Sequence, residues 1–226
     1  MKQIPSPNFN ARAEHVKLDY VVLHYTGMTD TESAIKRMTD PAAKVSAHYL
    51  IDEEGALVQM VEETERAWHA GISFWKNQTD MNSASIGIEL SNPGHEFGYR
   101  AFTQAQLSRL KLLLEDITKR HGMNRKSFLL AHSDIATTRK QDPGELFPWK
   151  DFAASGFGVF PELNSNIASD DTNETLLANI GYDISDYEAA LEAFKRRFYP
   201  EVFVNNLSEN TETRKRLLSV RNQIGI

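Results

Sequence analysis

Short apolar runs separated by polar turns fill the first two thirds of the chain, and they predict the strands of a sheet. A stretch at 128–136 has the length of a buried strand and would deliver His132 to a sheet edge. A second run, 20–24, ends at His24 in the same way. A third run places Glu89 where an apolar residue is expected, so this strand should border a cation or a cleft.

Turn signals make the predicted sheet mixed rather than purely parallel. Residues 47–51 and 56–60 are two apolar runs that flank a polar turn ending in Gly55. This arrangement predicts a β-hairpin, whose two strands are antiparallel.

The most regular helical pattern covers residues 103–121. Thr103 and Gln106 form a capping box at its start, and Gly122 ends it. Apolar residues recur along one face, at Leu107, Leu110, Leu114 and Ile117. We expect this helix to cover one side of the sheet. A shorter helix is predicted within 29–41, between polar caps and a proline.

The last quarter of the chain has a different pattern. Residues 163–171 are polar and predict a linker, and the helices expected beyond it cover about 173–180, 186–198 and 211–223. The predicted fold class is therefore α/β, with a mixed central β-sheet flanked by helices and a small C-terminal three-helix domain. We expect domains at 1–162 and 172–226. A helical unit of this size is marginal alone, so it should pack on the first domain or bind a partner.

Composition removes several classes of function. The chain of 226 residues contains no cysteine, which excludes disulfides, thiolate metal sites and cysteine nucleophiles. A net charge of −6 without a basic stripe argues against nucleic acid as the partner. No apolar run approaches the ~20 residues of a membrane-spanning helix, and residues 1–5 lead into polar sequence where a secretory signal would need an apolar core. We expect a cytoplasmic protein, or a periplasmic one if a leader precedes this sequence.

His24, His132 and Asp142 are the candidate metal ligands. Both histidines follow strand-like runs, and Asp142 precedes Pro143 in a loop that cannot be regular structure. Two imidazoles and one carboxylate form the three-ligand set of a catalytic zinc ion that keeps a fourth position for water. The alternative for each histidine is a hydrogen-bonded core residue without a metal.

Glu89 and Lys140 are the candidate catalytic side chains. Glu89 would accept the proton of the attacking water, and its alternative role is a structural salt bridge. Lys140 lies two residues before Asp142, so in an extended loop both side chains point to the same side. Its ammonium group would stabilise an oxyanion, and the alternative is a solvated loop charge.

The other histidines have separate expected roles. His48 should be a buried hydrogen-bond donor, and His69 should line a substrate cleft. Asp134 is expected to orient His132 or to cap the next turn. Phe9, in an extended entry segment, should pack against the body of the protein. The histidines expected at the surface are His15, His95 and His121.

Seven stretches of the sequence, in order, resemble the zinc amidases of the AmpD-like, amidase-2 group, which are N-acetylmuramoyl-L-alanine amidases. These stretches lie within about residues 1–160, at 6–9, 22–26, 45–49, 66–71, 85–89, 131–135 and 140–144. The resemblance implies hydrolysis of the amide between N-acetylmuramic acid and L-alanine of the peptidoglycan stem peptide. It implies zinc bound by His24, His132 and Asp142. The catalytic side chains implied are Glu89 and Lys140, and the substrate groove implied contains Tyr25, Thr26, Trp68 and His69.

The C-terminal segment is similar to the peptidoglycan-binding domain of the AmiD subgroup, in residues 176–183 and 193–200. The partners expected from the resemblance are muropeptides or peptidoglycan, and no protein partner is indicated. The alternative function is a non-catalytic peptidoglycan-binding module. A weaker alternative is a zinc peptidase that acts on another amide. The sequence leaves open whether the glycan is intact or in the 1,6-anhydro form.

Overall fold

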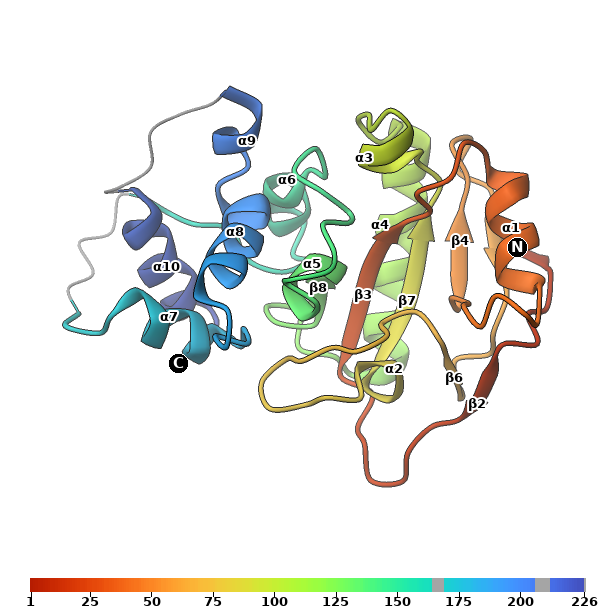
Figure 1. Ribbon diagram of the computed structural model, residues 1–226, viewed down its shortest axis with the longest axis horizontal. Coiled ribbons are helices and arrows are strands. Elements are labelled where there is room, and N and C mark those ends of the chain that lie inside the picture. Colours follow the sequence, from red (N-terminus) through yellow and green to blue (C-terminus); the bar gives the residue numbers. More distant parts are fainter. Residues whose placement is uncertain (164–168, 206–211, 226) are drawn as a thin grey trace.

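A six-stranded mixed sheet forms the centre of the computed structural model, which describes residues 1–163, 169–205 and 212–225 (Figure 1). The strands lie in the order β1-β5-β4-β7-β3-β8. Their bounds are Lys2–Gln3 (β1), Tyr20–Tyr25 (β3), Tyr49–Ile51 (β4), Leu57–Gln59 (β5), Ser85–Leu90 (β7) and Leu129–Ala131 (β8). β3 is parallel to β7 and β8, whereas β4 and β5 form the predicted antiparallel hairpin, so the mixed sheet is confirmed.

A second, two-stranded antiparallel sheet was not predicted. It pairs β2 (Phe9–Ala11) with β6 (Glu65–Ala67). All three residues of β2 are exposed, and Phe9 is 43% exposed. The expectation that Phe9 packs against the body is therefore wrong, because β2 runs along the surface and uses its backbone to pair with β6.

Alternation along the strands divides their side chains between two faces of the main sheet. Leu23 and Ile88 belong to the core on one face. His24 and Glu89, one residue further along β3 and β7, lie on the other face and are opposite each other in the parallel register. The alternation thus explains why the third predicted strand carries a carboxylate, since only one of its two faces borders this core.

Helix α4 (Gln104–His121) covers the first of these faces (Figure 1). Thr103 and Gln106 form the predicted capping box, and Gly122 ends the helix in a left-handed conformation. Helix α1 (Thr31–Thr39) is capped by Asp30 and lies near the other edge of the sheet, against β4 and β5. Shorter helices follow the strands, at Met81–Ala84 (α2), Gly94–Phe97 (α3), His132–Ile135 (α5) and Trp149–Ala154 (α6).

The C-terminal region is helical, as predicted. Its helices are α7 (Asn173–Ile180), α8 (Tyr187–Phe198), α9 (Glu201–Asn205) and α10 (Glu212–Gln223). The short α9 was not predicted, because Pro200 was interpreted as a stop, although proline is tolerated at the start of a helix. Most of the predicted linker, at 164–168, and residue 211 lie outside the described residues.

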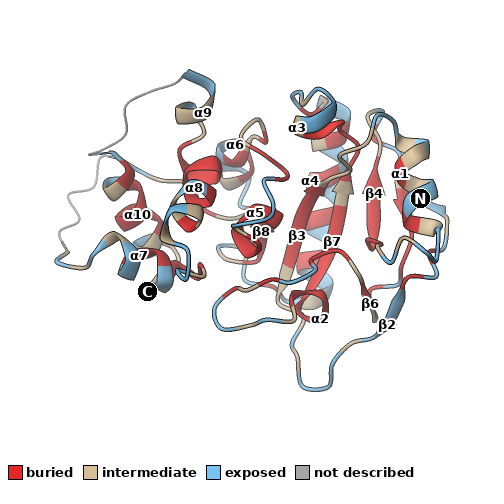
Figure 2. Cartoon of the chain, in the orientation of Figure 1, coloured by how far each residue is buried: buried red, intermediate tan, exposed pale blue. Residues whose placement is uncertain are grey.

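The C-terminal helices pack against the second face of the sheet rather than standing apart from it. One buried apolar cluster contains Val22 of β3 and Leu130 of β8 together with Leu177, Phe194 and Leu217 of the C-terminal helices. Figure 2 shows buried residues along both α8 and α5, which lie side by side. None of the described helices is both long and apolar enough to span a membrane.

Candidate active site

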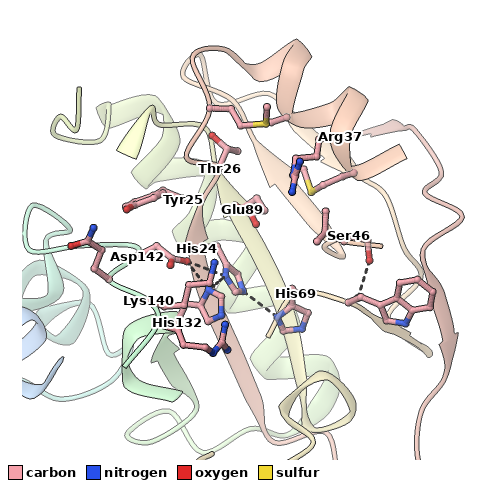
Figure 3. Close-up of a pocket in the computed structure, with 17 residues that line it drawn as sticks. His24, Tyr25, Thr26, Arg37, Ser46, His69, Glu89, His132, Lys140 and Asp142 are labelled. Atoms are coloured by element: carbon pink, nitrogen blue, oxygen red, sulfur yellow. Dashed lines mark hydrogen bonds and ion pairs between the residues drawn. The ribbon is translucent and has the colours of Figure 1, made fainter. Parts of the chain in front are cut away.

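Three potential ligand atoms meet at the ends of two neighbouring strands. His24 is the penultimate residue of β3, His132 begins α5 directly after β8, and Asp142 lies in the loop beyond α5. The Nδ1 atoms of His24 and His132 are 2.9 Å apart, and Oδ2 of Asp142 lies 3.1 and 2.9 Å from them, respectively. All three side chains are buried. The predicted trio is therefore brought together (Figure 3).

The chain around His132 differs in one respect from the prediction. The 128–136 stretch was expected to form a strand that carries His132 to the sheet edge, but β8 ends at Ala131. His132 begins a helical turn instead, which is closed by the hydrogen bond from Ala136 N to His132 O. Asp134 caps this turn by accepting a hydrogen bond from Ala131 N at 2.8 Å, so the capping alternative for Asp134 is the one observed.

The Nε2 atoms of His24 and His132 point away from the trio, and their hydrogen bonds determine the protonation of the Nδ1 atoms that point into it. His132 Nε2 lies 3.1 Å from the carbonyl oxygen of Ala70, which can only accept, so Nε2 carries the proton. His24 Nε2 lies 3.0 Å from His69 Nδ1, and the hydroxyl of Ser85 donates to Met81 O. His69 Nε2 must then donate toward Ser85, which leaves its Nδ1 to accept from His24.

The inner atoms of the trio are consequently lone-pair donors with no proton between them. Burial, with a contribution from the adjacent His132, lowers the pKa of His24 to about 4, so the imidazole is neutral at pH 7. Two imidazole nitrogen lone pairs and a carboxylate oxygen that point at one another repel unless a cation lies between them. The residues thus fit a divalent metal ion.

Glu89 lies beside this trio on the same face of the sheet (Figure 3). Its Oε2 atom is shielded from solvent and has no hydrogen-bond partner among the described residues. Burial, followed by the charge of Asp142, raises the pKa of Glu89 to about 8. The alternative role of Glu89 as a salt-bridge partner is not observed, because none of the ion pairs among the described residues includes it.

A pocket of about 330 Å³ opens above the trio, within the size range of ligand sites. Every residue predicted to belong to the site or the groove lines it, namely His24, Tyr25, Thr26, Trp68, His69, Glu89, His132, Lys140 and Asp142. The sequence did not indicate the wall formed by α1 and the segments before and after it, which contribute Met28, Ala34, Arg37, Met38, Val45 and Ser46. Only the path of α1 past the strand ends brings that wall to the pocket (Figure 3).

His95 was expected at the surface, and this expectation is wrong. Its Nδ1 lies 2.9 Å from the hydroxyl of Tyr25, and its Nε2 lies 3.1 Å from Glu145. The ring also stacks on Tyr99 with centroids 4.2 Å apart. His95 therefore holds the pocket residue Tyr25 from behind, a role without a local sequence signal because the contacts are 50 and 70 residues apart.

The other histidines lie outside the trio. His48 is fully buried, accepts a hydrogen bond from Gly87 N and lies 3.1 Å from Glu65 O, in agreement with its predicted role as a buried donor. His15 is exposed, as expected. His121 is half-buried and lies 2.7 Å from Glu63, so it belongs to an ion-pair cluster rather than to the free surface.

The chain is similar to known amidases over most of its length. A family model described as N-acetylmuramoyl-L-alanine amidase, Amidase_2, matches residues 14–145. N-acetylmuramoyl-L-alanine amidase AmiD of Escherichia coli K12 is 34% identical, over 89% of this chain and 82% of the relative. The 1,6-anhydro-N-acetylmuramyl-L-alanine amidase AmpD of Haemophilus influenzae is 31% identical, over 68% of this chain and 91% of the relative.

Two solved structures share nearly the whole fold. The complex of E. coli AmiD with anhydro-N-acetylmuramic acid-L-Ala-D-γ-Glu-L-Lys has a TM-score of 0.79 at 31% identity and covers 95% of this chain and 93% of its own. AmpDh3 from Pseudomonas aeruginosa in complex with anhydromuramic pentapeptide has a TM-score of 0.77 at 28% identity and covers 99% of both chains. The similarity to these structures includes the C-terminal helices as well as the sheet.

Proposed function

This chain belongs to the N-acetylmuramoyl-L-alanine amidase family Amidase_2, and we propose that it cleaves its substrate with a zinc ion held by His24, His132 and Asp142. The enzyme is an amidase that acts on the bond between N-acetylmuramic acid and L-alanine of the stem peptide. The observation that carries the zinc proposal is the convergence of three lone-pair donors on one buried point.

The donor set suits zinc better than magnesium or calcium. Imidazole nitrogen is a preferred ligand of zinc, whereas the harder cations magnesium and calcium select oxygen. When bound, zinc acts as a Lewis acid that polarises the scissile carbonyl and makes a water molecule more acidic. The outward hydrogen bonds to Ala70 O and His69 keep both Nδ1 lone pairs directed at the ion.

Glu89 is proposed as the general base. Its Oε2 is free to accept the proton of the attacking water, because no other described group donates to it. The pKa of about 8 in the metal-free protein indicates a carboxylate whose basicity is raised by its low-polarity surroundings. A cation at the neighbouring trio would favour the ionised form that accepts a proton.

Lys140 is proposed to stabilise the oxyanion of the tetrahedral intermediate. It lines the same pocket as Asp142, and its ammonium group favours the ionised form of Glu89, which indicates that it lies within electrostatic reach of the site. In the open part of the pocket, Tyr25, Thr26, Trp68 and His69 are proposed to orient the substrate. The relatives crystallised with anhydromuramic peptides support the 1,6-anhydro form as a substrate.

One incubation series separates the candidate functions. Purified protein is mixed with anhydro-muropeptides, intact sacculi and plain peptides, and the products are identified by mass spectrometry. We expect release of stem peptide from the muropeptide, its loss in chelator and its return on addition of zinc. Binding without release would favour the non-catalytic module, and cleavage of plain peptides would favour the peptidase. Release that continues in chelator would refute the metal proposal.

The Glu89→Ala variant completes this series. Binding of muropeptide should survive in the variant, while its turnover collapses, if the protein works as proposed. A variant that turns over substrate at the wild-type rate would exclude Glu89 as the base. The cytoplasmic location stays a prediction, which cell fractionation with an antibody against the chain would test.

A further inference from the structure

The loop segments that carry His132 and Asp142 are both held by helix α8 of the C-terminal region. Arg197 of α8 forms an ion pair with Asp134, two residues after His132, and donates to Leu129 O of β8 at 2.7 Å. The neighbouring Arg196 lies 3.4 Å from Glu145, three residues after Asp142. Figure 1 shows α8 beside α5, the helical turn that begins with His132.

Asp134 is the point at which these contacts converge. It is fully buried and accepts hydrogen bonds from Ala131 N at 2.8 Å and from the hydroxyl of Tyr182 at 2.7 Å, in addition to the pair with Arg197. Tyr182 and Arg197 both belong to the C-terminal region and are buried, at 2% and 5% exposed. A buried carboxylate with three donors occupies one position, because any displacement leaves a charge unpaired away from water.

Asp134 is linked to His132 through the backbone of one short helical turn. The two residues share the single turn of α5, in which Asp134 caps the backbone of Ala131 and His132 O accepts from Ala136 N. The next residue, Ser133, donates to Asp142 O at 3.0 Å, so the same turn also holds the third ligand. Arg197 additionally packs on the Trp149 ring at 4.4 Å, which attaches α8 to the catalytic part of the chain.

We propose that Tyr182 and Arg197 are positioning residues for the metal site, so that the C-terminal helices act through Asp134 to hold His132 where the ion binds. This inference rests on the proposed zinc site and adds a role at the metal to a region whose sequence resembles a peptidoglycan-binding domain. It implies that the metal affinity of this enzyme depends on side chains from outside the 14–145 region that the family model matches.

The Tyr182→Phe variant tests the proposal with the least disturbance. It removes one hydroxyl and keeps the ring, which packs on Trp75 and Phe194. Tyr49→Phe is the matched control, because it also removes a hydroxyl that donates to a buried carboxylate, that of Glu63, at 2.8 Å. Neither Tyr49 nor Glu63 lines the pocket. Arg197→Lys is the second variant, since it keeps the charge but loses the fork of donors that joins Asp134 to Leu129.

Zinc affinity is measured by competition with a chromophoric chelator, and thermal melts are recorded with and without zinc. We expect Tyr182→Phe to raise the Kd for zinc about tenfold and Arg197→Lys to raise it further, as for other groups that orient metal ligands. In Tyr182→Phe, saturating zinc should restore kcat. Tyr49→Phe should lower the melting temperature of the metal-free protein and leave the Kd unchanged.

Equal zinc affinity in Tyr182→Phe and Tyr49→Phe would overturn the proposal. If Arg197→Lys does not fold, the Tyr182→Phe result decides alone. Amide exchange of Ser133 and Ala136 in the metal-free protein gives a readout independent of zinc, and it should be faster in Tyr182→Phe than in Tyr49→Phe. Unchanged exchange would also overturn the proposal, whereas a wild-type protein that binds no zinc would refute the proposed function instead.

Discussion

Replacing Glu89 with glutamine should make the metal-free protein more stable and the zinc enzyme much less active. Burial raises the pKa of this carboxyl from 4.5 to about 8. Below pH 4.5 the Glu89 carboxyl is protonated in both the folded and the unfolded chain, so replacing it with glutamine changes the stability of the protein little. Between pH 4.5 and 8 the unfolded chain loses the proton while the folded protein keeps it, and the stability of the wild type falls as the pH rises.

The size of the effect follows from the two pKa values. A difference between 4.5 and about 8 corresponds to about 5 kcal/mol of folding free energy at high pH, if it is fully expressed. Glu89 is partly open to the pocket, so water screens part of this cost. We therefore expect the free energy of unfolding of the metal-free Glu89→Gln variant to be about 2–3 kcal/mol higher than that of the wild type at pH 9 and equal to it near pH 4.

Urea unfolding in the presence of chelator, from pH 4 to pH 9, measures this difference directly. Glu14→Gln is the matched control, because it removes an exposed carboxylate and should leave the pH dependence of stability unchanged. The same Glu89→Gln protein, loaded with zinc, should lose a factor of about 10²–10⁴ in kcat. If Glu89→Gln is no more stable than the wild type at pH 9, the carboxylate is not held in a costly environment and the argument for its raised basicity fails.

Three further changes test other parts of the site. Lys140→Met should lower kcat about 10²–10³-fold with a small change in KM, because the oxyanion loses its cation. Steady-state kinetics measures both constants, and a change confined to KM would contradict this role. The methyl group added by Gly87→Ala would lie 2.4 Å from the His69 ring, so it should displace the hydrogen-bond partner of His24. We expect the free energy of unfolding in urea to fall by about 1–3 kcal/mol and zinc binding to weaken. Unchanged zinc affinity would show that His69 does not orient His24. Chelation should lower the melting temperature, and zinc at about 1,000 times its Kd should restore about 4 kcal/mol of stability; an unchanged melt would mean that no ion is bound.

Local patterns were enough to predict the elements that carry the site. The runs at 20–24 and 86–90 became β3 and β7, and the capping box predicted α4. Each of these signals depends on residues within a few positions of one another, where alternation, caps and helix-ending glycines act. The trio was also predicted, because both histidines follow strand-like runs, Asp142 precedes a proline in a loop, and a chain without cysteine must bind a metal through histidine and carboxylate.

Features that depend on distant partners were not predicted. The β2–β6 sheet pairs residues that lie on average 56 positions apart in the sequence; its outer pairs are Phe9 with Ala67 and Ala11 with Glu65. No local pattern in either segment indicates which segment it pairs with. The contact of His95 with Tyr25 and the pairing of Arg197 with Asp134 are equally remote. Such contacts have no local signal, since a surface-like polar sequence becomes buried only when another element covers it.

Local sequence patterns specify which side chains can bind a metal and that two of them follow strand-forming runs. Their positions depend on the folded chain, since the parallel register of β3 and β7 sets Glu89 beside His24, and the packing of α8 pairs Arg197 with the turn that begins with His132. The physical reason is that ligand identity is a property of single side chains, whereas bringing donor atoms within about 3 Å requires the burial and hydrogen bonding of the whole fold.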